Sequence, residues 1–306
     1  DSSMVWAGRA AAPDILILAI DESSLARIGR WPWSRHRLAD AIDALALVAA
    51  TYAENRPGLS WRGIQDTTND PIVVGRAARA YLNYQMSEDY YRGGQMIWLE
   101  ADALIRAKSG GRKSLDDFAR AFFGVNDGEW KVQNTYTFED VVATLDGVQP
   151  HDWKTFLRDR LDGKVGLTGG IEASGWKLVY KDEPNAFAKS SGARGGGGAD
   201  YTYSLGLSLN KEGVVGDVRW DSPAFNAGIG SGTTLVAVNG QAYDKDVLDD
   251  AVKAAKGGGA PIELMLREFD LYRTVKLDYR GGLRYPHLER IEGKPDYLTP
   301  ILAARK

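Results

Sequence analysis

The sequence predicts an α+β fold, in which a mostly helical half precedes a smaller β-rich module. Apolar residues between residues 39 and 165 recur at the spacing of amphipathic helices. Residues 203 to 279 instead alternate as short strands do. The composition agrees, because 306 residues with 44% hydrophobic and 26% charged side chains can build two cores.

The clearest helix is predicted over residues 95 to 108. Its apolar positions recur at i, i+4, i+7 and i+8, and they are Ile97, Ala101, Leu104 and Ile105. The charged residues fall on its other faces, and they are Glu100, Asp102, Arg106 and Lys108. We therefore expect an amphipathic helix lying on a core, with Leu104 buried and Glu100 and Asp102 in solvent.

A second helix is predicted over residues 115 to 123. Ser114 and Asp117 have the spacing of a capping box, and Gly124 follows the last helical residue. Gly110 and Gly111 separate this helix from the one before it. The two helices should form a hairpin, with Asp116 and Asp117 acting in its cap rather than as a catalytic carboxylate pair.

Further helices are expected on either side of this hairpin. Residues 72 to 86 are predicted to be helical, and Thr137 with Asp140 forms a capping box for residues 138 to 145. Pro150 is expected to open another helix that ends before Gly163. Its apolar side chains share one face, and they are Trp153, Phe156, Leu157 and Leu161.

The β-rich module is predicted from a series of short alternating runs. These runs are YSLGLSL, VVGDVRW, TTLVAVNG, PIELMLRE and LYRTVKLDY. A helix is expected over residues 246 to 255, and Asn239 followed by Gly240 is typical of a hairpin turn. The preceding GARGGGGAD run lacks the Lys-Ser/Thr pair of a phosphate loop, so we expect a flexible linker there.

Charge and cysteine content exclude some classes of protein. A net charge of -3 gives no basic surface for nucleic acid, and the absence of Cys excludes disulfides and thiolate metal sites. The longest apolar runs, at residues 15 to 20 and 44 to 50, are much shorter than the ~18 residues of a membrane span. The chain begins at Asp1 without a leader, which suggests a fragment or a processed form.

Several motifs from about Ala39 to the C-terminus resemble one family. They are WRGIQDTTNDP, DYYRGGQMIWLEADALIRAKSGGRKSLDDFARAFFG, SPAFNAGI, RYPHLER and PDYL. This stretch resembles the glycyl aminopeptidases, bacterial zinc metallopeptidases that remove N-terminal Gly or Ala and carry a PDZ domain after the catalytic domain. The resemblance implies the helical half of a thermolysin-like peptidase domain followed by a PDZ-like domain.

The zinc site of that family should lie upstream of Ala39 and is not in this sequence. None of His36, His151 and His287 belongs to an HExxH motif, so we expect capping or surface histidines. No Ser-His-Asp arrangement with a nucleophile elbow is found either. We therefore expect no cofactor in this chain, no activity by the chain alone, and a missing zinc-bearing half as a partner.

Tyr91 is the candidate catalytic residue that the resemblance implies. In the wider group of zinc aminopeptidases a Y-E-K-G motif supplies a tyrosine hydroxyl that stabilises the oxyanion of the tetrahedral intermediate, and Y-R-G-G stands here. The two middle positions differ from that pattern. Tyr90 is the alternative, and both rings could simply pack at the head of the helix.

Ser204, Leu205, Gly206 and Leu207 stand where a PDZ domain has its carboxylate-binding loop. Consecutive backbone amides there can form an anion nest for the C-terminus of a peptide or protein partner. A valine at Gly206 is expected to block the peptide while the strand stays folded. In the alternative interpretation, the PDZ-like domain only packs on its own catalytic domain.

The N-terminal segment has a different resemblance. Residues 14 to 35, DILILAIDESSLARIGRWPWSR, resemble the start of the extracytoplasmic CHASE-type sensor domain of bacterial signalling proteins. Asp21 and Glu22 could form a ligand site, although a solvated turn is favoured because nothing nearby completes a site. A sensor function is a further alternative, and a periplasmic location is favoured over a cytoplasmic one.

The expected domain boundaries follow from these changes of pattern. They are a partial CHASE-like segment at 1 to 38, a helical peptidase-type domain at 39 to 165, a strand and Gly-rich linker at 166 to 200, a PDZ-like domain at 201 to 282, and a tail at 283 to 306.

Overall fold

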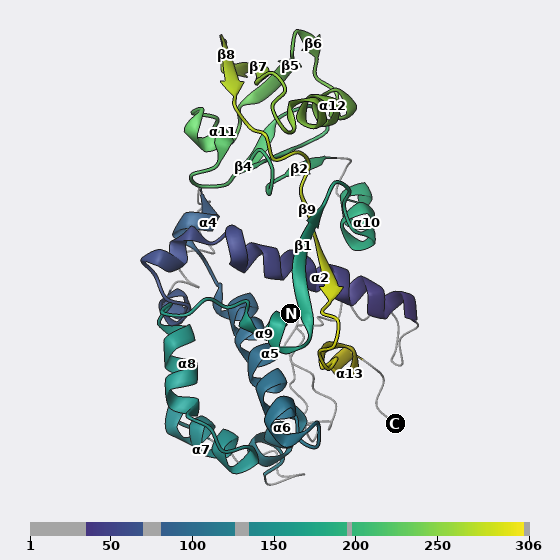
Figure 1. The fold of residues 1–306 in the computed structure, drawn as a ribbon. Coiled ribbons are helices and arrows are strands. Elements are labelled where there is room, and N and C mark those ends of the chain that lie inside the picture. The colour runs from purple at the N-terminus through teal and green to yellow at the C-terminus, as the bar shows by residue number, and fades with distance from the viewer. Residues whose placement is uncertain (1–34, 70–80, 126–134, 195–197, 303–306) are drawn as a thin grey trace, which may run out of the picture.

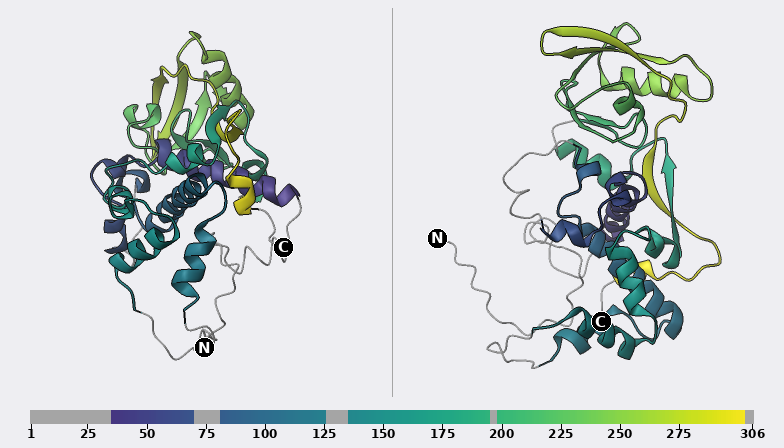
Figure 2. Two further views of the ribbon diagram at one scale, coloured as in Figure 1. Left: turned by 60° about the horizontal axis from the view of Figure 1, so that its bottom comes forward. Right: turned by 90° about the vertical axis from the view of Figure 1, so that its left-hand side faces the viewer.

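The structure is a helical body joined to a β-rich module. The computed structural model describes residues 35–69, 81–125, 135–194 and 198–302. The β-rich module (residues 198–283) stands above the helical body in Figure 1, and the right-hand view of Figure 2 shows it at one end of the molecule. A two-stranded ribbon of β1 and β9 runs alongside α2 on the body. The α+β prediction is confirmed.

The helical body contains α-helices and two 3-10 turns. Their bounds are α2 (Arg35–Glu54), η1 (Pro57–Ser60), η2 (Gln65–Asn69), α4 (Leu82–Gln85), α5 (Tyr90–Ser109), α6 (Leu115–Phe123), α7 (Phe138–Val148), α8 (Trp153–Leu161), α9 (Gly169–Ala173), α10 (Ala186–Arg194) and α13 (Leu298–Leu302). No helix in these described segments is both long and apolar enough to cross a membrane.

The strands form three small antiparallel sheets. Their bounds are β1 (Trp176–Lys181), β2 (Ala199–Tyr201), β3 (Leu207–Leu209), β4 (Val215–Val218), β5 (Thr234–Val238), β6 (Gln241–Ala242), β7 (Ile262–Glu268), β8 (Leu271–Leu277) and β9 (Tyr285–Arg290). The module holds the sheets β2-β3-β4 and β6-β5-β7-β8. Two helices complete it, α11 (Pro223–Asn226) and α12 (Lys245–Ala255).

The α5 and α6 hairpin confirms the capping and glycine signals. Ser114 and Asp117 form the capping box of α6, and Gly110 ends α5 in the left-handed conformation. The core face of α5 is also confirmed in part, because Ile97, Ala101 and Ile105 are buried.

Two carboxylates of α5 that we expected in solvent are instead enclosed. Asp102 is buried and accepts a hydrogen bond from the Leu115 amide at 2.7 Å, so it ties the start of α6 to α5. Glu100 receives two hydrogen bonds from the Arg160 guanidinium, one of them at 2.7 Å. The sequence prediction was wrong for both residues, because Glu100 meets Arg160 of α8, and Asp102 binds the first amide of α6 as well as Arg106 of its own helix. Leu104, expected to be buried, is only partly covered.

The other helices differ from prediction mainly at their ends. The helix after the Thr137 capping box extends to Val148 rather than residue 145. Pro150 does not open α8, which begins at Trp153 because the Asp152 side chain caps it through the Thr155 amide. The helix expected over residues 72 to 86 lies largely outside the described residues, and its described part contains only α4.

The strand expected before the Gly-rich linker pairs with the segment that we expected to be a tail, and the two form one ribbon. β1 pairs antiparallel with β9, from Trp176 opposite Arg290 to Lys181 opposite Tyr285. His287 therefore lies in a strand, where its Nε2 atom is 2.8 Å from the Glu183 carbonyl oxygen. The boundary expected at residue 38 falls inside α2, which continues through it as one helix.

Each half has its own apolar core. In the body, buried side chains of α2, α5, α7 and α8 belong to one cluster that includes Trp153, with Ile64 and Leu167 from the connecting segments. In the module, the inner faces of both sheets and α12 enclose a second cluster that includes Tyr201 and Leu248. The two cores are separate, so the join between body and module depends on a small number of polar and aromatic contacts.

The carboxylate of Glu54 forms the polar part of this join. Its two oxygens accept hydrogen bonds from Arg284 at 2.7 and 3.2 Å, and Arg219 lies 3.7 Å away. Arg284 also donates to the Tyr203 carbonyl at 3.1 Å. Glu54, the last residue of α2, thereby contacts Arg219 directly after β4 and Arg284 directly before β9. Through Arg284 it is also connected to Tyr203 in the loop after β2.

Asn83 and a group of aromatic rings form the second part of the join. The Asn83 amide donates to the Val218 carbonyl and its side-chain oxygen accepts from the Trp220 amide, both at 2.9 Å. The Trp220 ring stacks on Tyr84 with centroids 4.1 Å apart, and Tyr81 meets it edge on. Because Asn83 is buried, loss of its bonds would leave polar groups of both halves unpaired.

The different burial of neighbouring residues on α5 gives a stability prediction. Ile105→Ala should lower the free energy of unfolding by about 2 to 5 kcal/mol, because it removes a fully buried side chain. Leu104→Ala should cost less, since Leu104 is only partly covered. Chemical denaturation of the two variants measures both values, and equal losses would show that the orientation of α5 is wrong.

Candidate functional site

The turn before α5 has an unusual concentration of backbone strain. Tyr81, Met86 and Glu88 all have positive φ, at 54°, 59° and 50°. They are three of the six non-glycine residues with positive φ in the described ranges. Such conformations cost free energy and persist where surrounding contacts enforce them, often at functional sites. The turn at 86 to 91 is therefore the first candidate site.

A buried carboxylate holds this turn in place. Asp89 Oδ1 accepts hydrogen bonds from Arg56 Nε at 2.7 Å and from the Tyr52 hydroxyl at 3.0 Å. Its Oδ2 atom accepts from the Ser87 amide at 2.8 Å. Burial, followed by the Asp89 charge, raises the pKa of Tyr52, so that hydroxyl remains a hydrogen-bond donor. The strained backbone is thus fixed by the C-terminal part of α2.

The two tyrosines at the head of α5 lie against each other. Their ring centroids are 4.4 Å apart, and a hydrogen bond with Tyr91 raises the pKa of Tyr90 to about 12. The Tyr90 amide donates to Thr67 Oγ1 at 3.2 Å, which ties the pair to η2. Tyr91 is 62% exposed, so its ring is not part of a core. The Tyr91 ring is thus accessible at the head of α5, beside Tyr90.

Gly93, two residues further on, allows close packing under these rings. A Cβ atom there would lie 2.6 Å from Ile64 Cδ1 and 3.3 Å from a Leu167 methyl carbon. The glycine lets α5 approach the chain before η2 and the segment before α9. The second glycine of the Y-R-G-G motif, Gly94, has open space instead.

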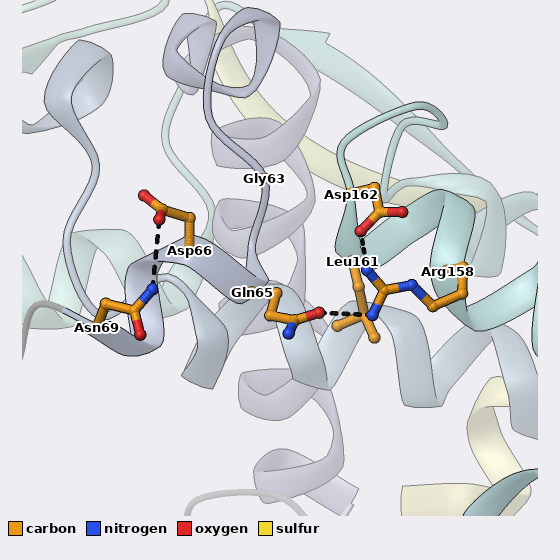
Figure 3. A pocket seen from close by; sticks show the side chains of 7 residues that line it. All are labelled: Gly63, Gln65, Asp66, Asn69, Arg158, Leu161 and Asp162. Atoms are coloured by element: carbon orange, nitrogen blue, oxygen red, sulfur yellow. Dashed lines mark hydrogen bonds and ion pairs between the residues drawn. The ribbon is translucent and has the colours of Figure 1, made fainter. Parts of the chain in front are cut away.

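A shallow polar pocket lies on the other side of η2 (Figure 3). Its volume is about 340 Å³, and it is lined by Gly63, Gln65, Asp66, Asn69, Arg158, Leu161 and Asp162. Arg158 spans the pocket, donating to Gln65 Oε1 at 2.6 Å and to the Asp162 carboxylate. Hydrogen bonds, chiefly from Arg62, lower the pKa of Asp66. These polar groups are bonded to one another, so none of them is arranged as a free nucleophile or base.

The histidines contribute no metal site to the part of the chain that the structure describes. His151 packs edge on against Trp153 at 5.2 Å, and burial lowers its pKa. His287 contacts a carbonyl oxygen in β9, and the side chain of His36 lies outside the described residues. Among described residues, no three His, Cys, Asp or Glu side chains come together as metal ligands would.

Ser204 to Leu207 do not form an open anion nest in this structure. The amides of Ser204 and Gly206 both donate to the Tyr201 carbonyl, at 3.0 and 2.8 Å. β3, which begins at Leu207, pairs with β2 on one edge and β4 on the other. A peptide could add to β3 only if β2 moved away, so peptide binding here stays a prediction with that requirement.

The expectation that Gly206 tolerates a β-branched residue was wrong. Gly206 has φ +86°, and an added Cβ atom would lie 2.0 Å from Ser222 Cβ. Glycine is needed because L-residues rarely adopt this conformation and because Ser222, the N-cap of α11, packs directly against it.

Sequence reasoning found Tyr91 but missed the residues that position it. Asp89 stands at the N-cap position of α5, but its side chain makes no capping bond. It binds Arg56 and Tyr52 instead, which lie 33 and 37 residues upstream. Nothing in the spacing of Tyr52 on α2 and Arg56 two residues after it shows this contact. The alternative ligand residues, Asp21 and Glu22, lie outside the described residues.

Two comparisons with known proteins bear on this geometry. The pattern of the CHASE2 domain family matches residues 1–52, which extends past the segment that first suggested it and into α2. The structure is similar to the crystal structure of an aminopeptidase N family protein from Idiomarina loihiensis, with a TM-score of 0.50 and 17% sequence identity. No curated protein matches the sequence.

The structural match covers most of this chain but only part of the other protein. It covers 84% of this chain but 46% of the Idiomarina loihiensis protein, so this chain spans less than half of its length. The common fold confirms the coarser part of the sequence prediction, a likeness to aminopeptidases in architecture. At this identity the comparison defines a fold class and says nothing of activity.

The buried ion pair under the strained turn gives a prediction. Arg56→Ala should lower the free energy of unfolding by about 3 to 5 kcal/mol, because it leaves the Asp89 carboxylate buried without its cation. The control is Arg120→Ala, which breaks a solvent-exposed pair with Asp117 and should cost less than about 1 kcal/mol. Thermal and urea unfolding compare the two variants, and similar losses would mean that Asp89 is not the anchor of the turn.

Gly206 gives a second prediction. Gly206→Val should destabilise the module by at least about 2 kcal/mol, through strain at positive φ and the clash with Ser222. Gly94→Ala is the control, because nothing lies within 4 Å of the added methyl and α5 should gain about 0.5 to 1 kcal/mol in helix propensity. A fully stable Gly206→Val variant, measured by denaturation followed by circular dichroism, would contradict the observed backbone conformation.

Proposed function

We propose that residues from about 39 onward are the helical half and PDZ-like domain of a zinc aminopeptidase, with Tyr91 as the oxyanion-stabilising group of the complete enzyme. The observation that carries this proposal is the exposure of Tyr91 in the first turn of α5, directly after a strained turn that Asp89 anchors. An aromatic ring that served only packing would have no need for such a turn. The Y-R-G-G motif and the shared aminopeptidase architecture support the same conclusion.

In this proposal the chain positions a substrate and does not itself activate water. A phenol hydroxyl held near a scissile carbonyl can donate to the oxygen as negative charge develops on it, which is worth several kcal/mol in comparable sites. Asp89, Arg56 and Tyr52 act as positioning residues, because they fix the backbone from which Tyr91 projects. Removing any of them should disturb the placement of the hydroxyl rather than its chemistry.

Zinc does not fit the described residues of this chain. His151 and His287 are far apart in sequence and each is occupied by its own neighbours, an aromatic pair and a carbonyl oxygen. The Asp89 carboxylate near Tyr91 is also engaged, since it is bound to Arg56. We therefore assign no zinc ligand here and place the metal of the complete enzyme on a zinc-bearing half outside this sequence.

Recognition of a peptide C-terminus by the module is the second candidate function. The order of strands and helices, with Ser204 to Leu207 before β3, supports it. The paired edges of β3 weigh against it, because no edge of that strand is free in the described structure. The packing of the module on the body through Glu54 and Arg284 favours a structural role.

An extracytoplasmic location is part of the same proposal. It rests on the CHASE2 match over residues 1–52, since CHASE-type domains are extracytoplasmic sensors in bacterial signalling proteins. A sensor function of this segment has no support in the described residues, because Asp21 and Glu22 lie outside them.

The test of Tyr91 uses a chimera in which the zinc-bearing half of a glycyl aminopeptidase is joined ahead of Ala39. The chain alone, supplied with zinc, should not hydrolyse glycyl or alanyl p-nitroanilide, whereas the chimera should. Tyr91→Phe in the chimera should lower kcat by about 100-fold to 1,000-fold with little change in KM. Tyr90→Phe is the matched control and should keep most of the activity. Equal effects of the two substitutions, or hydrolysis by the chain alone, would contradict the proposal.

A further inference from the structure

Within the described residues, no strand pairs with the outer edge of the four-stranded sheet, and this edge is regular. β8 ends the order β6-β5-β7-β8, and its pairing with β7 runs from Ile262 opposite Leu277 to Glu268 opposite Leu271 without a register shift. The opposite edge, β6, has only two residues. The hairpin of β7 and β8 lies at the top of Figure 1 and projects at the upper end of the right-hand view in Figure 2.

This edge lacks the usual protection against pairing with another strand. Natural edge strands are often interrupted by Pro, by a bulge or by an outward-pointing Lys. β8 contains no Pro and no bulge. Of its two cations, Arg273 binds Glu268 at 2.9 Å and the carbonyls of Ala227 and Gly228, whereas Lys276 is exposed and lies 3.6 Å from Glu263.

Large apolar side chains gather at the tip of the same hairpin. Phe269 is 98% exposed, Leu271 71% and Tyr272 62%. Phe269 also has φ +55°, a strained conformation that Asn or Gly would adopt more easily in a two-residue turn. Exposed apolar residues concentrated on one element mark an interaction surface more often than single exposed residues do.

We propose that β8 pairs antiparallel with β8 of a second copy of this chain, so that two modules share one continuous sheet. The sequence of β8 is complementary to itself about Thr274. A two-fold axis there places Leu271 opposite Leu277, Tyr272 opposite Lys276, Arg273 opposite Val275 and Thr274 opposite Thr274. All seven residues of the strand are then paired, with no like charges opposite one another and with each side chain on the matching face of the sheet.

Other two-fold registers fit less well. An axis at Arg273 places two guanidinium groups opposite each other, and an axis at Val275 leaves Leu271 without a partner in the strand. Pairing about Thr274 also covers Leu271 and places Tyr272 beside a cation, an arrangement that favours aromatic rings. The inference does not depend on the proposed peptidase function, because β8 lies in the module and far along the chain from Tyr91.

The test uses single cysteines, which is straightforward because the native sequence has none. Residues directly opposite each other in an antiparallel pair have Cα atoms about 4.5 to 5.5 Å apart, within disulfide range. Under mild oxidation, Thr274→Cys should therefore form a covalent dimer with itself. Val165→Cys, at a site that is also exposed but lies on the helical body, should remain monomeric.

A mixing experiment tests the register. Tyr272→Cys and Lys276→Cys should each crosslink poorly alone, and an equimolar mixture of the two should give a disulfide-linked dimer on a non-reducing gel. Crosslinking of Tyr272→Cys with itself, or none by Thr274→Cys, would overturn the proposed pairing.

The unmodified chain supplies an independent measurement. In sedimentation equilibrium it should associate to a dimer as its concentration rises, whereas Leu271→Lys with Tyr272→Lys should weaken association at least tenfold. These side chains are exposed, so the double variant should keep the circular dichroism spectrum of the native fold. Val165→Lys should associate as the native chain does. A native chain that stays monomeric, or one weakened equally by Val165→Lys, would overturn the proposal.

Discussion

The end of α2, together with Arg56 two residues beyond it, is the feature on which both halves of the molecule depend. On one side, Tyr52 and Arg56 bind the buried Asp89 carboxylate and so fix the head of α5. Between them, Glu54 binds Arg284 and holds the module. Because a charged group removed from water must be paired, these contacts constrain the positions of their elements more tightly than apolar packing would. The candidate site and the module are therefore placed by the same few residues.

The same principle explains the other enclosed carboxylates of the body. A single alanine separates Glu100 from Asp102 on α5, yet the two side chains contact different residues. Glu100 meets Arg160, whose guanidinium also lies 3.8 Å above the Phe156 ring, whereas Asp102 meets the amide that begins α6. The Glu100 contact connects helices that are distant in sequence, whereas the Asp102 contact connects two consecutive helices. The body is thus held by specific polar bonds at its helix junctions as well as by its apolar core.

The strands of the module differ in how far their edges are protected from pairing with another strand. β3 is enclosed by β2 and β4, and β6 is too short to attract a partner. Only β8 presents a long regular edge, and the apolar residues of the module that reach solvent concentrate beside it. A sheet with one very short edge strand and one long edge strand directs association to the long one, because unpaired backbone groups bind another strand wherever they remain accessible.

The sequence alone determined the local structure, and the tertiary fold decided the site. Capping boxes at Ser114 and Thr137, glycines at helix ends and strand alternation predicted most elements, since these signals act within a few residues. The positive φ of Gly206, the pairing of β1 with β9 and the continuity of α2 through residue 38 were not predictable in this way. Nor were the partners of Asp89, because a carboxylate on a predicted helix end gives no sign of which distant arginine will neutralise it. The sequence named Tyr91, but only the folded chain shows that it projects from a turn held by α2, since that arrangement arises from contacts between segments more than 30 residues apart.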